Sequence, residues 1–239
     1  MRVEISVESV AGARIAAAAG AARVELCAGL SDGGLTPSAA LTEAASALAE
    51  VHVLVRPRPG GFHYDRDELA LIVRDIAVAR EHGATGVVVG ALGGDGHVDD
   101  VCAEFVAAAE GMQTTFHRAI DAGADSRRAL ERLVELGFTR VLTSGRRRSV
   151  LDGAPLIRDL VTLAGDRIEV MACGGVRAAN AGRVLAATGV RDLHAAPRRP
   201  VGTAPGGDVS YAGLTVPPGH DHFETDAAEV AALCAVLAD

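Results

Sequence analysis

Residues 20–38, GAARVELCAGLSDGGLTPS, combine a short strand pattern with a glycine-rich turn and the start of a helix. Within RVELC, the apolar Val24 and Leu26 alternate with Glu25 and Cys27, so the two kinds of side chain lie on opposite faces of a strand. A carboxylate and a thiol therefore point together from the end of a strand toward a tight turn. Active sites on barrels of alternating strands and helices are usually built in this way. The alternative is a salt-bridged glutamate beside a buried free thiol.

The pattern of strand, turn and helix recurs along the whole chain. After the first glycine-rich turn, Thr36 and Pro37 predict a helix start, with the hydroxyl as N-cap and the proline at the first helical position. Strands are expected near residues 2–7, 23–27, 51–56, 85–90, 112–117, 139–144, 168–173 and 190–195. Helices are expected near residues 9–19, 37–49, 66–82, 99–109, 126–136, 154–164, 177–188 and 225–238.

Strict alternation of this kind implies parallel strands joined by right-handed crossovers. We therefore predict an α/β fold, a single (β/α)₈ TIM barrel over residues 1–239, with an irregular segment at about 197–223 before the last helix. An open doubly wound sheet is the alternative. The irregular segment is a candidate lid or oligomer contact.

Composition excludes several classes of function. The formal net charge of -8 argues against a general nucleic-acid surface or an anionic membrane surface, and no apolar run reaches membrane-spanning length. The four cysteines lack the paired spacing of zinc or redox sites, which favours reduced thiols and a cytoplasmic location. The chain contains no lysine, since all 23 basic residues are arginine, and Schiff-base chemistry on an internal lysine is thereby excluded.

The phase of each strand predicts which side chains enter the barrel. Four of them come late in their strands and are expected at the C-terminal mouth, namely Glu25, Arg56, His117 and His194. Glu4 is expected deeper in the barrel, bonded to arginine or to backbone. Because a closed interior rich in ionisable groups is costly, these charges must pair or reach solvent.

Two arginines stand where the third strand ends, in RPRPGGFHYD at residues 56–65. Prolines between them fix the backbone, so that Arg56 and Arg58 can present preset guanidinium forks to a carboxylate or a phosphate. We expect Arg56 to pair with Glu25 and to hold that carboxylate ionised, and Arg58 to meet the ligand.

A histidine ends the fifth strand, in TTFHRAID at residues 114–121. His117 faces inward, with Arg118 and Asp121 following at the mouth, and Ser144 offers a hydroxyl at the end of strand six. A histidine beside an arginine and acids can act as general acid or base, or bind a hydroxylated substrate. The alternative is a structural histidine.

The seventh strand ends in ACGGV, where Gly174 and Gly175 lead into a helix. Backbone N–H groups at such a turn can hold an anion, and TIM barrels often bind phosphate near the loops of strands seven and eight. Arg198 or Arg199, after strand eight, would add positive charge. We predict an anion site at this turn.

Four stretches, GAARVELCAGLSDGGLTPS, VLVRPRPGGFHYD, TTFHRAID and RVLTSG, resemble in order and spacing those of the CutC family of copper homeostasis proteins. The similarity extends to about residue 196. It implies a (β/α)₈ barrel, a cytoplasmic location, a homodimer or higher homo-oligomer, and a role in copper homeostasis with Cu(I) bound through cysteines. Cys27 is the residue that the resemblance marks for the metal.

The sequence departs from that pattern in the first strand. Members that resemble the animal protein carry there a thiol that pairs with the one in ELC, and Ser6 stands at this position here. Because a site for a soft metal needs thiolate or thioether ligands, we expect no high-affinity copper site.

Two classes of function remain open. One is a copper-handling protein, as the resemblance implies. The other is a barrel enzyme that acts on a small polar or anionic, sugar-like substrate, with Glu25 and His117 as its acid–base pair. Its reaction would be an isomerisation or an epimerisation, or a hydrolysis with a divalent ion on Glu and His ligands.

Overall fold

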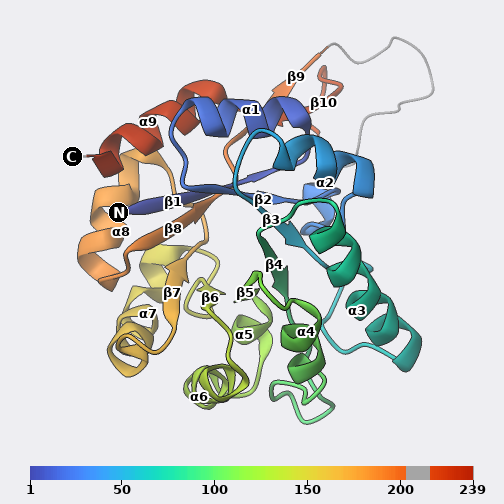
Figure 1. The fold of residues 1–239 in the computed structure, drawn as a ribbon. Coiled ribbons are helices and arrows are strands. Elements are labelled where there is room, and N and C mark those ends of the chain that lie inside the picture. The colour runs from blue at the N-terminus through green and yellow to red at the C-terminus, as the bar shows by residue number, and fades with distance from the viewer. Residues whose placement is uncertain (203–215, 239) are drawn as a thin grey trace.

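The computed structural model describes residues 1–202 and 216–238, and its centre is a closed barrel of eight parallel strands (Figure 1). The strands follow one another around the barrel in sequence order, and the last pairs with the first. They are β1 (Arg2–Val7), β2 (Arg23–Leu26), β3 (Val51–Leu54), β4 (Gly86–Val89), β5 (Gln113–Phe116), β6 (Arg140–Thr143), β7 (Glu169–Ala172) and β8 (Asp192–Ala195). The predicted TIM barrel is confirmed.

Helices cover the outside of this barrel (Figure 1). They are α1 (Val10–Ala18), α2 (Ala39–Ser46), α3 (Arg66–Glu81), α4 (Cys102–Ala108), α5 (Ala119–Ala122), α6 (Ser126–Leu136), α7 (Val150–Ala164), α8 (Ala178–Thr188) and α9 (Ala227–Ala238). The short α5 and a 3₁₀ turn, η1 (Leu30–Asp32), were not predicted. Helix α7 begins four residues before the predicted start, with Pro155 inside it.

The start of α2 differs from its prediction. Ser38 is the N-cap, and its hydroxyl accepts a hydrogen bond from the N–H of Leu41. Thr36 is occupied elsewhere, since its hydroxyl accepts the N–H of Arg56 at 3.0 Å. Thr36 therefore joins the turn after β2 to the end of β3 and does not cap the helix.

The segment predicted to be irregular has regular structure at both ends. Strands β9 (Arg198–Val201) and β10 (His222–Thr225) pair antiparallel, outside the barrel. Residues 203–215 of this segment, which was predicted as a lid or oligomer contact, lie outside those that the structure describes. No described helix is long and apolar enough to cross a membrane.

The two faces of the strands separate apolar packing from polar chemistry, as the alternation predicts. Val3, Ile5 and Val7 belong to the main hydrophobic core, which lies between the strands and the helices. The polar side chains of the same strand, Glu4 and Ser6, are buried inside the barrel. Packing of helices on strands thus stabilises the fold, and the barrel interior holds these polar groups beside two small apolar clusters, one with Leu54 and one with Leu142.

Candidate functional site

The lower half of the barrel interior holds a closed network of ion pairs. Arg23 donates to Glu4 at 2.7 Å and to Asp192 at 2.7 Å, while Arg140 lies 3.2 Å from Asp192 and 3.0 Å from Glu169. We call the floor network the set Arg2, Arg23, Arg140, Glu4, Glu169 and Asp192. Each of its charges faces at least one opposite charge, which is the condition for keeping ions inside a barrel.

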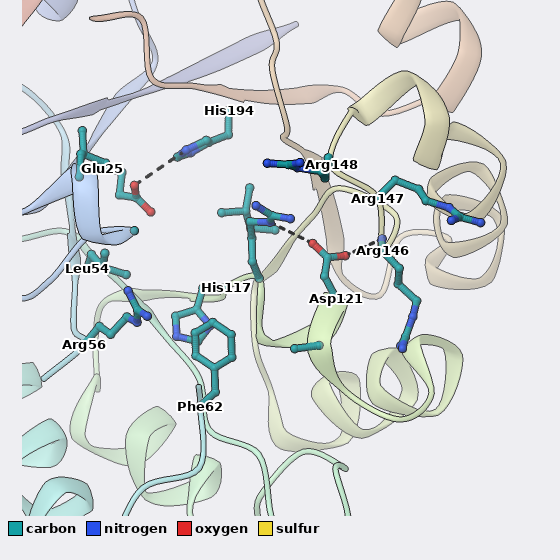
Figure 2. Close-up of a pocket in the computed structure, with 15 residues that line it drawn as sticks. Glu25, Leu54, Arg56, Phe62, His117, Asp121, Arg146, Arg147, Arg148 and His194 are labelled. Carbon is teal, nitrogen blue, oxygen red and sulfur yellow. Dashed lines mark hydrogen bonds and ion pairs between the residues drawn. The ribbon is translucent and has the colours of Figure 1, made fainter. Parts of the chain in front are cut away.

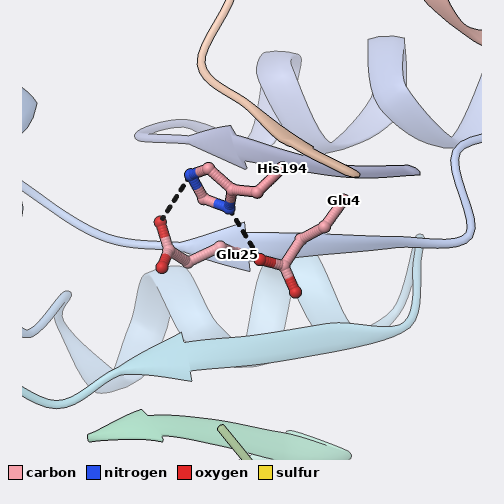
Figure 3. A group of neighbouring side chains, drawn as sticks. All are labelled: Glu4, Glu25 and His194. Carbon is pink, nitrogen blue, oxygen red and sulfur yellow. Dashed lines mark hydrogen bonds and ion pairs between the residues drawn. The ribbon is translucent and has the colours of Figure 1, made fainter. Parts of the chain in front are cut away.

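Above the floor network, His194 lies between two carboxylates on neighbouring strands (Figure 3). Its Nδ1 is 2.7 Å from Glu4 Oε1, and its Nε2 is 3.9 Å from Glu25 Oε2. Burial alone would lower the pKa of His194, but the charge of Glu25 and the hydrogen bond and charge of Glu4 outweigh it and raise that pKa. Glu4 therefore orients the imidazole, and Nε2 faces Glu25 across a gap too long for a hydrogen bond.

Glu25 is buried and belongs to the same group. Ser6 donates its hydroxyl proton to Glu25 Oε2 at 2.7 Å. Burial raises the pKa of Glu25, and the charge of Glu4 adds to this effect, while the charge of His194 opposes it. A carboxyl group that holds its proton more tightly than usual thus stands beside a histidine that does the same.

The expected ion pair between Arg56 and Glu25 is wrong. The guanidinium of Arg56 donates to the backbone carbonyls of Asp32, Gly34 and Gly60, and it lies over the ring of Phe62 at 5.4 Å. The loops after β2 and β3 fold around this side chain. Arg56 therefore holds the wall of the site together and does not keep Glu25 ionised.

Arg58 lies away from the site. Its guanidinium forms an ion pair with Glu68 in the first turn of α3 and donates to the carbonyl of His63 at 2.7 Å. Arg58 does not line the cavity described below, so its position does not match the expected contact with a ligand.

His117 is buried at the mouth, at the end of β5. Its Nδ1 accepts the N–H of Ala119 at 3.2 Å, and its ring lies 4.7 Å from that of Phe62. Burial and the charge of Arg56 lower the pKa of His117 to about 3. The imidazole is therefore neutral near pH 7 and is a poor base, in contrast to His194.

A cavity of about 640 Å³ opens at the C-terminal mouth and brings most of the predicted residues together (Figure 2). Glu25 and His194 lie on one side of it, and Asp121 lies on the other. Its lining includes Glu25, Arg56, His117, Arg118, Asp121 and His194. Ser144 supports this lining from below, accepting a hydrogen bond from Arg118 at 2.7 Å.

Three consecutive arginines line the same cavity and were missed from the sequence. Arg146, Arg147 and Arg148 form half of the loop between β6 and α7. The signal was present, since GRRRS follows directly on the strand-six stretch VLTSG in a chain of net negative charge. A run of charges in a loop is usually a solvated surface, and this is why the pattern carried no prediction.

The turn with Gly174 and Gly175 lies outside the cavity lining. The first N–H of α8, that of Ala178, is taken by the carboxylate of Glu229 at 2.8 Å. Arg198 faces Glu8 at 3.5 Å and Arg199 faces Glu224 at 3.7 Å, so each is already paired with an acid. The geometry gives the predicted anion site no support.

The thiols do not form a site suited to Cu(I). Cys27 is fully buried, and the neighbours of its sulfur are the hydroxyl of Ser6 and the carbonyl of Val7, each at 3.6 Å. Burial, reinforced by the charge of Glu25, raises its pKa, which disfavours the thiolate that the metal needs. Cys173, the other inward thiol near the mouth, is also buried with a raised pKa.

A harder divalent ion has a different set of ligands available. Ligand atoms of Glu4, Glu25 and His194 lie within 4.8 Å of one another, the one such group among the described residues. Because the imidazole stands between the two carboxylates, Glu4 orients it and only Glu25 and His194 Nε2 face the cavity together (Figures 2 and 3). With only these two protein ligands, a divalent ion would need further ligands from the substrate.

Comparison with solved structures shows that this barrel is similar to a CutC protein. CutC from Streptococcus agalactiae, whose name assigns it provisionally to copper homeostasis, superposes with a TM-score of 0.77 at 33% identity, covering 81% of this chain and 97% of that one. Thiamine phosphate pyrophosphorylase from Pyrococcus furiosus reaches a TM-score of 0.60 at 14% identity, covering 99% and 95% of the two chains, which shows the fold alone.

Sequence comparison agrees. CutC of Pasteurella multocida is 43% identical over 197 residues, 81% of each chain. CutC of Xanthomonas campestris pv. campestris is 41% identical over 240 residues, 99% of each chain. The model of the CutC family matches residues 1–198, which include the whole barrel and its mouth. The chain belongs to the CutC family, and the solved member from Streptococcus agalactiae is named for copper homeostasis.

Proposed function

We propose that this member of the CutC family binds a small anionic, hydroxylated molecule at the mouth of the barrel and transfers protons to and from it. The observation that carries the proposal is the group of Glu4, His194 and Glu25 beside the cavity. Glu4 orients His194 through a hydrogen bond of 2.7 Å, and His194 Nε2 and Glu25 remain without a direct hydrogen bond to each other.

Two titratable groups side by side suit acid–base chemistry. His194, whose raised pKa favours the protonated imidazole, can deliver a proton, and Glu25, whose raised pKa makes its carboxylate a stronger base than usual, can remove one. The pair proposed from the sequence, Glu25 with His117, is thus replaced by Glu25 with His194. His117 keeps a binding role, because its low pKa makes it a neutral hydrogen-bonding group.

The opposite wall of the cavity suits an anion. Arg118, Arg146, Arg147 and Arg148 line it, and Asp121 is the one acid that lines it on that side. In a chain of net charge -8, this local excess of positive charge indicates a negatively charged ligand. The absence of lysine excludes Schiff-base chemistry on an internal lysine, and the reactions that we propose are isomerisation, epimerisation or hydrolysis.

The family's name points instead to copper handling. A protein can act in copper homeostasis through a metabolite, without binding Cu(I) itself. The burial of the thiols in this chain supports a role of that kind. We propose that copper does not bind at Cys27. The resemblance supports a cytoplasmic homo-oligomer, and sedimentation of the purified protein tests the assembly.

The test of the proposed chemistry is proton exchange. The protein is incubated in D₂O with a panel of aldoses, sugar acids and their phosphates, and NMR follows isomer formation and the replacement of carbon-bound hydrogen by deuterium. We expect at least one compound to exchange, and Glu25→Gln and His194→Gln each to abolish the exchange. Arg183→Gln, an exposed change on α8, is the control and should exchange like wild type.

The competing interpretation is that Glu25, His194 and Glu4 form a closed structural network. It is supported if no compound of the panel exchanges or raises the melting temperature, while Glu25→Gln and His194→Gln both melt far below wild type. That combination would overturn the proposal.

A further inference from the structure

The loop between β6 and α7, here called the arginine loop (Ser144–Ser149), is held rigidly by its backbone. A Cβ on Gly145 would lie 2.2 Å from the carbonyl oxygen of Gly153, so the loop begins in direct contact with the first turns of α7. Arg146 has a φ of 62°, the one described residue other than glycine in the left-handed region. Backbone of this kind persists only where its surroundings impose it.

Hydrogen bonds fix the same loop at both ends. The carboxylate of Asp121 accepts the N–H groups of Ser144 and Arg146 at 2.9 and 3.0 Å. At the far end, the N–H of Val150 donates to the carbonyl of Gly174 at 2.9 Å. Gly174, whose N–H was predicted to bind an anion, thus supports this loop through its carbonyl.

The arginine side chains differ in how far they are paired. Arg146 donates to the carbonyl of Gly123 and lies 3.5 Å from the hydroxyl of Ser126, so its guanidinium is tied to the protein. Arg147 and Arg148 have no hydrogen-bond or ion-pair partner for their guanidinium groups among the described residues. Figure 2 shows Arg148 reaching over the cavity toward His194, whereas Arg147 points away from it.

Arg118 supplies a second cation to the same space. Its Nε is 3.1 Å from Asp121 and its Nη2 donates to Ser144, which fixes the plane of the guanidinium and leaves Nη1 without a partner in the described part of the chain. Because Asp121 is already shared among several donors, it does not neutralise Arg148 as well. One oriented guanidinium and one unpaired guanidinium thus line one side of the cavity.

We propose that the arginine side of the cavity is a binding site for the phosphate group of a phosphorylated, hydroxylated small molecule, held between Arg118 and Arg148. A dianion matches two guanidinium groups, because Arg148 can donate two parallel hydrogen bonds to phosphate oxygens and Arg118 can donate from Nη1. A carboxylate would satisfy one of them and leave the other unpaired. This inference rests on the proposed function only in assigning the remainder of the molecule to Glu25 and His194.

Calorimetric titration at fixed ionic strength tests the site with four probes, D-ribose 5-phosphate, D-ribose, D-gluconate and inorganic phosphate. We expect the two phosphates to bind and ribose to show no binding. Arg148→Gln should weaken ribose 5-phosphate by about tenfold or more, since a hydrogen bond to a charged group contributes about 1.5–3 kcal/mol. Arg148→Lys should recover part of the affinity, and Arg183→Gln, which removes an equal charge from α8, should match wild type.

Three results would overturn the phosphate site. They are the absence of phosphate binding at millimolar concentration, an unchanged affinity in Arg148→Gln, and binding of gluconate as tight as that of ribose 5-phosphate. Glu25→Gln separates this inference from the proposed chemistry, because it should lose proton exchange and still bind inorganic phosphate. Phosphate binding without proton exchange of any compound would refute the proposed chemistry alone. Proton exchange of a phosphorylated compound that is equal in Arg148→Gln and wild type would refute the phosphate site alone.

Discussion

The floor network and the mouth of the barrel are both lined with charges, but they differ in how completely those charges are paired. In the floor network, Asp192 receives hydrogen bonds from Arg2, Arg23 and Arg140. At the mouth, Glu25 is bonded to Ser6 and stands 3.9 Å from His194. Saturated charges fix a structure, whereas charges with unused bonding capacity can act on something that enters.

The same chemical change, from acid to amide, should have its largest effect in the floor network. Asp192→Asn removes the negative charge that three buried or half-buried arginines share, and breaking such a network costs about 3–5 kcal/mol. Urea unfolding measures the loss. Asp159→Asn, at an exposed pair with Arg127, is the control, with an expected loss of at most about 1 kcal/mol. Equal losses in both variants would refute the view that the floor network is structural.

Glu25→Gln makes the matched change at the mouth and should have a much smaller effect on stability. Burial already disfavours the ionised form of Glu25, and an amide can still accept the hydrogen bond of Ser6. We expect a change in the free energy of unfolding within about 1 kcal/mol. A loss as large as that of Asp192→Asn would show that both layers are structural.

The two layers should also respond to pH in opposite directions. The raised pKa of His194 contributes stability that is present below its unfolded value of 6.5 and is lost as the pH rises through the folded value. The lowered pKa of Glu4 contributes stability above its unfolded value of 4.5 that is lost in acid. As the pH rises above 6.5, wild type should lose stability, and His194→Gln should show a flatter slope. A slope unchanged in His194→Gln would contradict this assignment.

The smallest effect is expected from the thiol of Cys27, which directly follows β2. Cys27→Ser should leave Cu(I) binding as it is in wild type, because we expect no stoichiometric binding in either protein. Competition with a strong Cu(I) chelator measures this. Stoichiometric binding that disappears in Cys27→Ser would restore the copper site that the family resemblance implies.

The fold could be predicted because it follows from periodicity. Alternation along each strand identified the inward side chains, and Glu25, His117 and His194 all lie at the mouth as expected. Membership in the CutC family was also recognisable from the strand ends. Both depend on local patterns that a single sequence contains.

The partners of these side chains could not be predicted, because they depend on loop paths and on barrel closure. Arg56 bonds to carbonyls of two loops whose course no pattern gives. The bond between Glu4 and His194 requires the register that sets these two residues opposite each other on β1 and β8. Arg148 stands over the cavity only because the glycines at 145 and 153 bring its loop against α7.

The hydrogen bond between Glu4 and His194 joins residues 190 positions apart in the chain. A ribosome therefore releases Glu4 and Arg23 long before Asp192 and His194, which complete both layers from β8. Until then Arg23 and Glu4 have each other, but each lacks its partner on β8, so a nascent half-barrel keeps incompletely paired interior charges and has little reason to close. Closure of the ring and assembly of the site are then one late event, and a truncated product of this gene would lack both together.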